Sequence, residues 1–347
     1  MNHLAFFKDI TKNNVDIAGG KGASLGEMTS AFARASADKN AHNPVPPGFV
    51  VLANAFDRFI EETQLKEEIV ARLKAVNPAD MNSVDKASNV LRDAIHDVAM
   101  PTDLEKEILA AFETLDAEYV AVRSSATAED SSVASWAGEL ETYLNTTREN
   151  VLERVRKCWS SLFTPRAIFY RHEKNLIDAH VSVAVVIQKM VQSEISGIAF
   201  TVHPVTEDYD QMIIEAGFGL GEAIVSGQIT PDSYVISKKE MSILDIYVST
   251  QGRKLVRAHK QENNPPTGGS KNQIDEENPS NEWVELSESE GSKQKLSGKQ
   301  IIEAAKVFAG IEKHYGFPCD IEWAMEGGKL YITQSRPITT LKASVKG

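Results

Sequence analysis

The strongest chemical signal in the sequence is a hairpin pattern at residues 319–336, within CDIEWAMEGGKLYITQSRPI. Side chains alternate between the two faces of a strand, so Asp320 and Glu322 share a face of the first strand, and Gln334 and Arg336 share a face of the second. Carboxylate and amide oxygens are hard ligands that suit Mg²⁺, and a guanidinium suits phosphate. The pattern therefore indicates a site for a magnesium-bound phosphate compound. The alternative is the solvated polar face of an amphipathic hairpin.

Whether these side chains converge depends on how the two strands are connected. A plain two-residue turn at the glycines 327–328 pairs Glu322 with Thr333 and sends Gln334 to the opposite face. An odd-length loop or a bulge brings the polar side chains to one face, and the odd-length loop would place Asp320 across from Gln334. We expect one of these two irregularities in the hairpin.

Two other segments place a basic residue beside glycines or small residues. GGKGASLGEM puts Lys21 after two glycines and before a predicted helix, which favours an anion, although the spacing matches neither a Walker A loop nor Gly-x-Gly-x-x-Gly. AVRSSATAEDSSVASWAGELETYLN puts Arg123 at the end of a buried strand and continues through small polar residues to Gly138 and Thr142, a composition typical of a phosphate-covering loop. The alternative for the Lys21 segment is an ordinary turn, and the alternative for the Arg123 segment is a surface loop whose arginine forms a structural salt bridge. We expect residues 126–137 to be mobile without nucleotide.

Other reactive side chains give weaker signals. Glu215 and Glu222 flank the glycine-rich segment GFGLG, which is equally typical of a strand-to-helix turn. Cys158 lies on an amphipathic helical stripe and Cys319 at an inward strand position, so both are predicted to be core residues. The histidines are scattered without a metal-ligand pair at helical spacing, and His203 is expected to end a strand.

Composition narrows the class of protein. The chain has 347 residues, 42% hydrophobic and 25% charged, which is enough for two lobes with cores of their own. A net charge of -12 makes nucleic acid and anionic membranes poor partners. Two cysteines fit a reducing cytoplasm, no apolar run approaches the ~20 residues of a membrane span, and the first residues lack a signal-peptide pattern. We therefore expect a cytoplasmic protein.

The surrounding pattern predicts an alternation of helices and strands. Residues 61–115 show helical periodicity, and the helical stretch from 147 to 175 is interrupted at Pro165. VPPGFVV is a predicted strand, and VSVAVVIQKMVQSEISGIAF contains two strands around a polar turn. A helix is predicted between an N-cap at Ser297 and a terminating Gly316.

Taken together, five segments resemble the N-terminal nucleotide-binding domain of phosphoenolpyruvate synthase (pyruvate, water dikinase): GGKGASLGEM, VPPGFVV, AVRSSATAEDSSVASWAGELETYLN, EAGFGLGEAIVSGQITPDSYVI and DIEWAMEGGKLYITQSRPI. The same domain occurs in pyruvate phosphate dikinase and rifampin phosphotransferase. The resemblance covers residues 5–342 and implies an ATP-grasp fold of the α/β (α+β) class, with mixed or antiparallel sheets flanked by helices. It also implies an N-terminal lobe at 1–190 and a C-terminal lobe at 191–342 that close on ATP.

The resemblance implies that Lys21, Arg123 and Arg336 contact the phosphates of ATP, and that Gly138 and Thr142 lie in the loop that covers them. It implies that Gln188 lies near the nucleotide. Mg²⁺ would be bound by Glu322 and Gln334, with Asp320 in support. The three cations would also be the catalytic residues, because phosphoryl transfer needs mainly positioning and charge neutralisation. In the family the phosphoryl group moves to a histidine on a separate swivelling domain and from there to pyruvate.

The sequence also departs from the family. Glu139 follows Gly138 where glutamine is most common, and His203 stands where aspartate is common. None of the eight histidines lies in the family's phosphohistidine segment, and no pyruvate-binding barrel is encoded. We therefore expect an incomplete pyruvate, water dikinase-like phosphotransferase, with the phosphohistidine domain in cis in a longer protein or in trans. The alternatives are the ATP domain of a rifampin phosphotransferase-type enzyme and a non-catalytic nucleotide-sensing module.

Overall fold

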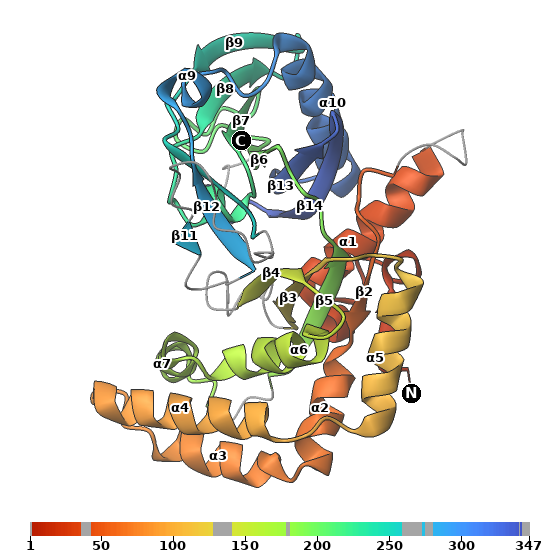
Figure 1. Cartoon of the computed structure of the whole chain (residues 1–347), viewed down its shortest axis with the longest axis vertical. Coiled ribbons are helices and arrows are strands. Elements are labelled where there is room, and N and C mark those ends of the chain that lie inside the picture. The colour runs from red at the N-terminus through yellow and green to blue at the C-terminus, as the bar shows by residue number, and fades with distance from the viewer. Residues whose placement is uncertain are drawn as a thin grey trace, which may run out of the picture. The chain divides into compact units, whose positions relative to one another are not determined.

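The chain folds into two compact units (Figure 1). The first comprises Met1–Ser30 and Pro47–Met190, and the second comprises Ala31–Pro46 and Val191–Gly347. The continuous first lobe expected from the sequence is therefore interrupted, because the segment Ala31–Pro46 belongs with the second unit. The computed structural model describes residues 2–35, 43–127, 141–177, 181–258, 273–274, 280–339 and 341.

A five-stranded antiparallel sheet forms the centre of the first unit, in the order β1-β2-β5-β3-β4. Its strands are β1 Leu4–Phe6, β2 Gly48–Val51, β5 Val183–Lys189, β3 Val120–Ala126 and β4 Thr142–Thr146. All of β3 and nearly all of β5 are buried, as their unbroken apolar sequences predict for strands that are covered on both faces. This burial confirms the predicted buried strand, but Arg123 lies in its middle and not at its end, because β3 continues to Ala126.

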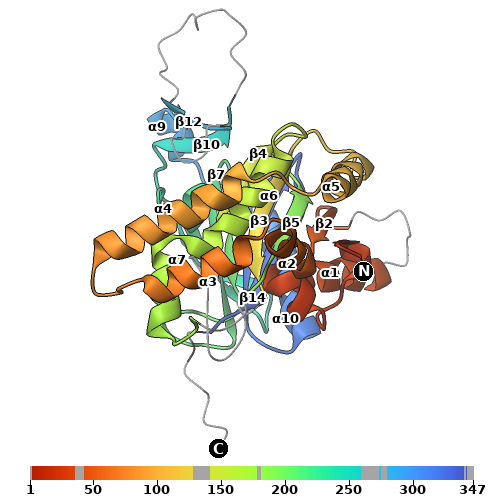
Figure 2. The ribbon, with the colours of Figure 1, turned by 90° about the horizontal axis from the view of Figure 1, so that it is seen from below.

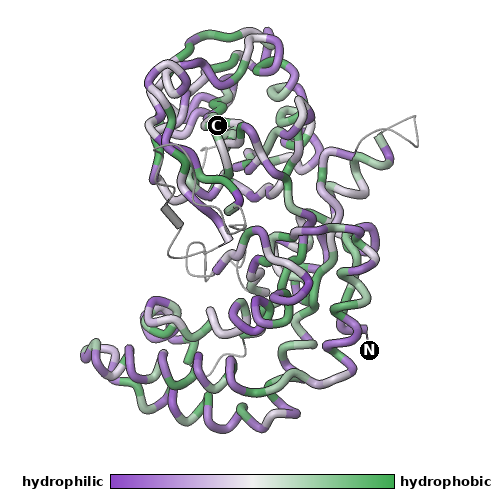
Figure 3. The backbone as a smooth tube through the Cα atoms, viewed as in Figure 1, coloured by the Kyte–Doolittle hydropathy of each residue, from purple (hydrophilic) through white to green (hydrophobic). Residues whose placement is uncertain are grey.

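Helices cover one face of this sheet (Figure 2). The helical elements of this part of the chain are η1 Phe7–Asp9, α1 Val15–Ala35, α2 Ala53–Glu62, α3 Leu65–Ala75, α4 Met81–Asp97, α5 Thr102–Thr114, α6 Val151–Ser160, η2 Ser161–Phe163 and α7 Pro165–Glu173. Trp159 of α6 is fully buried, and its ring centroid lies 4.9 Å from that of Phe59 of α2. In Figure 3 the strands are mostly hydrophobic, whereas α3 and α4 alternate along their length. The predicted interruption at Pro165 is confirmed, and Thr164 caps the new helix.

The N-terminal part of α1 packs on the other face of this sheet. The helix is broken at Gly19, whose φ of 67° and ψ of 170° are accessible to glycine but strained for other residues. Ser125 of β3 donates a hydrogen bond from Oγ to the Ala18 carbonyl (3.0 Å), and a Cβ on Gly22 would lie 3.1 Å from Val50. The glycines therefore allow α1 to approach the sheet closely, and Lys21, expected before the helix, lies within α1 just after its break at Gly19.

The second unit contains two antiparallel sheets. The larger has the order β14-β13-β6-β7-β8-β9, and the smaller has the order β10-β12-β11. The strands are β6 Ile195–Phe200, β7 Gln211–Phe218, β8 Asp232–Ser237, β9 Ser242–Tyr247, β10 Arg253–Arg257, β11 Gln273–Ile274, β12 Asn281–Glu285, β13 Cys319–Glu326 and β14 Lys329–Pro337. The two strands predicted on either side of Gln192 exist as β5 and β6, but they belong to different sheets and do not pair with each other.

A long helix, α10 Gly298–Tyr315, covers one face of the six-stranded sheet (Figure 1). It begins with a capping box between Ser297 and Gln300 and ends at Gly316, which has a left-handed φ of 76°, so both predicted ends are confirmed. Phe308 of α10 packs against Trp323 of β13, with ring centroids 6.3 Å apart. Two short helices, α8 Glu222–Val225 and α9 Glu288–Gly291, complete the unit. None of the described helices is long and apolar enough to cross a membrane.

Candidate functional site

The β13–β14 hairpin places Glu322 directly across from Gln334. The strands are joined by a two-residue turn at Gly327 and Gly328, whose φ values are 56° and 72°. A register shift next to Glu322 leaves Thr333 as an extra residue of β14 and restores Gln334 to the Glu322 face. The predicted bulge is therefore confirmed. The odd-length loop that would have placed Asp320 across from Gln334 is wrong, because the two glycines form a tight turn.

Asp320 is instead paired with Arg336, in the neighbouring row of the same face. Arg336 donates from Nε to Asp320 Oδ2 at 2.9 Å, and its Nη2 lies 2.8 Å from the same oxygen. The aspartate side chain is 12% exposed and the arginine side chain 47%, so the pair joins a sheltered carboxylate to an accessible cation. Burial raises the pKa of the Asp320 carboxyl, Arg336 lowers it, and the nearby Glu322 raises it.

The register also brings Glu215 of β7 into the Glu322 row. Ile198 of β6 pairs with Glu322 on one side and with Glu215 on the other. Because neighbouring strands lie roughly 4.8 Å apart, the two glutamates are separated by about 10 Å at Cα. Burial, and then the charge of Asp320, raise the pKa of the Glu215 carboxyl. The sequence drew attention to Glu215 but gave it no role, because its row is determined by strand order.

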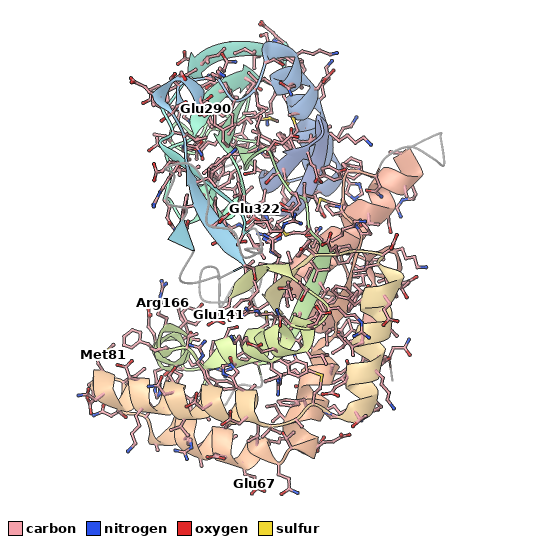
Figure 4. All side chains as sticks on the ribbon, in the orientation of Figure 1. Glu67, Met81, Glu141, Arg166, Glu290 and Glu322 are labelled. Atoms are coloured by element: carbon pink, nitrogen blue, oxygen red, sulfur yellow. The ribbon has the colours of Figure 1, made fainter. Side chains whose placement is uncertain are left out.

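The opposite face of the hairpin is apolar and buried. Cys319, Ile321 and Trp323 alternate with the acidic residues and are at most 1% exposed. Cys158 is fully buried in the first unit, so the prediction that both thiols are core residues is confirmed. One face of the hairpin is thus committed to packing against α10 (Figure 1), which leaves the polar face for chemistry. Figure 4 marks Glu322 on this hairpin.

The donor set of the polar face fits Mg²⁺ held jointly with phosphate oxygens. Within the described residues, no group of three or more histidine, cysteine, aspartate or glutamate side chains is placed to hold a metal by itself. Mg²⁺ is usually bound through one or two carboxylates together with substrate phosphates and water rather than by an all-protein cage. Glu322, Gln334 and Asp320 provide two carboxylates and an amide oxygen, which is the kind of set this mode requires.

In the first unit, the predicted phosphate-binding residues lie on the face of the sheet that α1 covers. Arg123 of β3 pairs directly with Thr142 of β4, and Gln188 of β5 pairs with Ala121, two residues before Arg123. Arg123 is 8% exposed and Gln188 is 2% exposed. Lys21 lies in α1 two residues after Gly19, close to where the helix contacts β3. The structure therefore places these four residues on or beside one face.

The segment predicted to cover the phosphates is described only at its two ends. Gly138, Glu139 and nearly all of 126–137 lie outside the described residues. Just after the segment, Glu141 is paired with Arg92 at 2.6 Å and accepts a hydrogen bond from Tyr143 (Glu141 is labelled in Figure 4). At the other end, the backbone N–H and side-chain hydroxyl of Thr127 both donate to the Ser182 carbonyl. One end is thus fixed to α4 and β4, and the other to the residue that precedes β5.

Comparison with known families identifies the class to which these features belong. The model of the family "Pyruvate phosphate dikinase, AMP/ATP-binding domain" matches residues 15–347. The chain therefore belongs to this family, and its antiparallel sheets flanked by helices are those of an α/β ATP-grasp-like domain.

Several curated relatives are named as phosphoenolpyruvate synthases. The chain is 43% identical over 353 residues to a "Probable phosphoenolpyruvate synthase" of Methanocaldococcus jannaschii, covering 100% of the chain and 27% of the relative. It is 44% identical over 349 residues to a protein of the same name from Archaeoglobus fulgidus, covering 99% of the chain and 42% of the relative. The "Phosphoenolpyruvate synthase" of Pyrococcus furiosus is 39% identical over 381 residues, covering 98% of the chain and 44% of the relative. The chain thus spans less than half the length of each of these three relatives.

Proposed function

We propose that this chain is the Mg-ATP-binding part of a phosphoenolpyruvate synthase-like phosphotransferase, and that it passes a phosphoryl group from ATP to a histidine on a separate domain for transfer to pyruvate. The family match and the printed names of the relatives support the reaction class. The observation that carries the proposal is the bulged hairpin, because it aligns Glu322 with Gln334 beside the Asp320–Arg336 pair.

On the hairpin, Glu322 and Gln334 would hold Mg²⁺, which when bound would neutralise part of the charge on the ATP phosphates. Arg336 would donate to a phosphate oxygen. Its guanidinium carries five N–H donors, so it can keep its bond to Asp320 while it binds phosphate. Asp320 would thereby orient Arg336 as well as support the metal site.

In the first unit, Arg123 and Lys21 would bind phosphate and stabilise the charge that develops as a phosphorus–oxygen bond of ATP breaks and a phosphorus–nitrogen bond to histidine forms. Thr142, directly opposite Arg123, would donate its hydroxyl to the same group, and Gln188 would contact the nucleotide. Arg123 extends from a rigid buried strand, which favours precise placement of its charge.

The proposal can be tested by reconstitution. We expect the chain with Mg-ATP and pyruvate to form no phosphoenolpyruvate, because direct transfer would need pyruvate held in line at near-attack distance. Adding a fragment of a relative that carries its phosphohistidine and pyruvate-binding domains should restore product, and Arg123→Ala should abolish it. Sustained product from the chain alone would contradict the proposed division of labour.

The reconstitution assay also distinguishes the proposed function from the rifampin phosphotransferase-type domain and from the nucleotide-sensing module. Phosphorylation of a rifamycin hydroxyl by the reconstituted mixture, without phosphoenolpyruvate, would favour the rifampin phosphotransferase-type reading. Tight ATP binding without transfer to any phosphohistidine fragment would favour a nucleotide-sensing module.

A further inference from the structure

The glycine-rich segment Gly217–Gly221, called the loop below, comprises the last two residues of β7 and the turn into α8, and it has no part in the proposed function so far. We propose that Gln251 is a positioning residue that fixes this loop on the Glu322 face of the six-stranded sheet, and that Mg-ATP affinity depends on this fixation. The inference rests on the proposed function, and it assigns a role to a residue that touches neither ATP nor metal in that proposal.

The loop crosses the same face that carries Glu322. Ser196 of β6 pairs with Ala324, two residues after Glu322, so its side chain projects from the Glu322 face. The Ser196 hydroxyl donates to the Gly219 carbonyl at 2.6 Å, and the Ser193 hydroxyl donates to the same carbonyl at 3.0 Å. The loop is therefore bound to the sheet one row away from the proposed metal ligands.

Gln251 holds the loop through its side-chain amide. Its Oε1 accepts from the Phe218 N–H at 2.8 Å, while its Nε2 donates to the Phe218 carbonyl at 2.8 Å and to the Arg253 carbonyl at 2.9 Å. The amide thus pairs with both backbone groups of Phe218 as a neighbouring strand would. Gln251 is 2% exposed, so water has little access to replace these bonds.

The loop is also joined to the three-stranded sheet. The Leu220 N–H donates to the Leu255 carbonyl of β10 at 2.8 Å, and the Gly219 N–H donates to the Glu194 carbonyl at 3.0 Å. Gly219 has a φ of 92°, and a Cβ there would lie 2.4 Å from the Leu255 carbonyl oxygen. The contact with β10 therefore requires glycine, and it fixes the loop between the two sheets of the second unit.

Gln251 is itself anchored by a buried ion pair. Lys295 Nζ lies 2.8 Å from Asp232 Oδ1, and both side chains are 0% exposed. The Ser249 N–H donates to the same carboxylate at 2.9 Å, and Lys295 also donates to the Gly291 carbonyl at 3.2 Å. That carbonyl accepts from the Gln251 N–H at 3.1 Å. A continuous set of bonds therefore runs from the ion pair to the loop.

The consequence for binding is entropic. Gly219 and Gly221 make the turn after Phe218 conformationally free when it is not held, and glycine loses the most backbone freedom on ordering. With Gln251 in place this loss occurs during folding rather than when ATP binds. Releasing Phe218 should weaken Mg-ATP binding on the order of tenfold, which corresponds to the cost of ordering about one residue.

The test compares Gln251→Leu, which removes all three side-chain bonds, with Gln251→Glu, which keeps only the acceptor for the Phe218 N–H. The matched control is Lys238→Met, which removes the two bonds of the Lys238 ammonium to Glu312 in the same unit and shares no residue with the set of bonds that holds the loop. Each variant is measured by thermal unfolding, by hydrogen exchange at the Phe218 and Leu220 amides, and by calorimetric titration with Mg-ATP.

We expect both Gln251 variants to exchange these amides faster and to bind Mg-ATP more weakly than the wild type. Lys238→Met should lower the melting temperature while leaving exchange and affinity unchanged. Wild-type affinity in Gln251→Leu, or an equal loss in Lys238→Met, would overturn the positioning role. Absence of Mg-ATP binding in the wild type would overturn the proposed function and this inference with it, so the two failures are distinguishable.

Discussion

Replacing Gly19 with alanine should strongly destabilise the first unit, because α1 can approach β3 only without a side chain there. A Cβ on Gly19 would lie 2.2 Å from Ser125 Oγ, 2.4 Å from the Ser125 carbonyl oxygen and 2.7 Å from its carbonyl carbon. Rotation of the serine side chain could relieve the first overlap. The other two involve the backbone of a buried central strand, so the helix must move instead.

The size of the effect follows from two costs. An L-residue held at φ 67° and ψ 170° is strained by roughly 1–3 kcal/mol. Forcing extra volume into a packed contact typically adds about 1–3 kcal/mol. We therefore expect Gly19→Ala to lower the free energy of unfolding of the first unit by about 2–6 kcal/mol. Because Lys21 lies two residues along the same helix, Mg-ATP affinity should fall as well.

The matched control is Gly227→Ala. Gly227 also has a left-handed φ of 71°, but a Cβ there would meet nothing within 4 Å. Gly227→Ala should therefore lower the free energy of unfolding only by the cost of the left-handed backbone, roughly 1–2 kcal/mol. Urea unfolding followed by pulsed hydrogen exchange reports each unit separately. If Gly19→Ala costs no more than Gly227→Ala and leaves affinity intact, the close approach of α1 to β3 is wrong.

The remaining predictions concern the cation of the hairpin, the thiols and alkaline pH. Arg336→Ala should weaken Mg-ATP binding roughly tenfold to a hundredfold in calorimetry, because it removes a charge-assisted bond. The control Arg58→Ala, which breaks the ion pairs of Arg58 with Glu62 and Asp103 in the first unit, should leave the affinity unchanged; equal affinities of the two variants would remove the phosphate role of Arg336. Burial raises the pKa of the Cys158 thiol and raises that of Cys319 to about 12, so both should react slowly with a disulfide reagent in the native protein and quickly once it is unfolded; rapid native labelling would contradict their placement. Because the folded-state pKa values of both thiols lie above the ordinary thiol pKa of 9.0, their contribution to stability is fully present below that pH. It is lost as the pH rises toward the folded-state values, so the urea midpoint should fall between pH 8 and pH 10.5; a constant midpoint would contradict this linkage.

Features fixed by neighbouring residues could be predicted from the sequence. The ends of α10 follow from Ser297, Gln300 and Gly316, whose signals lie within a few residues of the backbone groups they cap. The alternation of Asp320 and Glu322 with buried apolar residues likewise follows from strand geometry alone.

Features fixed by long-range pairing could not be predicted. The sequence predicts an odd-length loop or a bulge in the hairpin but does not decide between them, and only the pairing of β13 with β14 identifies Thr333 as the extra residue. Glu215 joins the Glu322 row because β6 lies between their strands, an order set by the whole sheet. Similarly, the role of Gln251 depends on packing among four separate segments of the second unit.

The most direct test of the central claim is the calorimetric titration of the chain with ATP, performed with Mg²⁺ and again with a chelator, on the wild type and on Glu322→Gln. We expect saturable binding to the wild type that depends on Mg²⁺. The Mg²⁺ dependence should be largely lost in Glu322→Gln, because the variant retains the shape of the side chain but lacks the negative charge opposite Gln334. Equal affinity with and without Mg²⁺, or an unchanged Mg²⁺ dependence in the variant, would contradict the assignment of the hairpin as the metal–phosphate site.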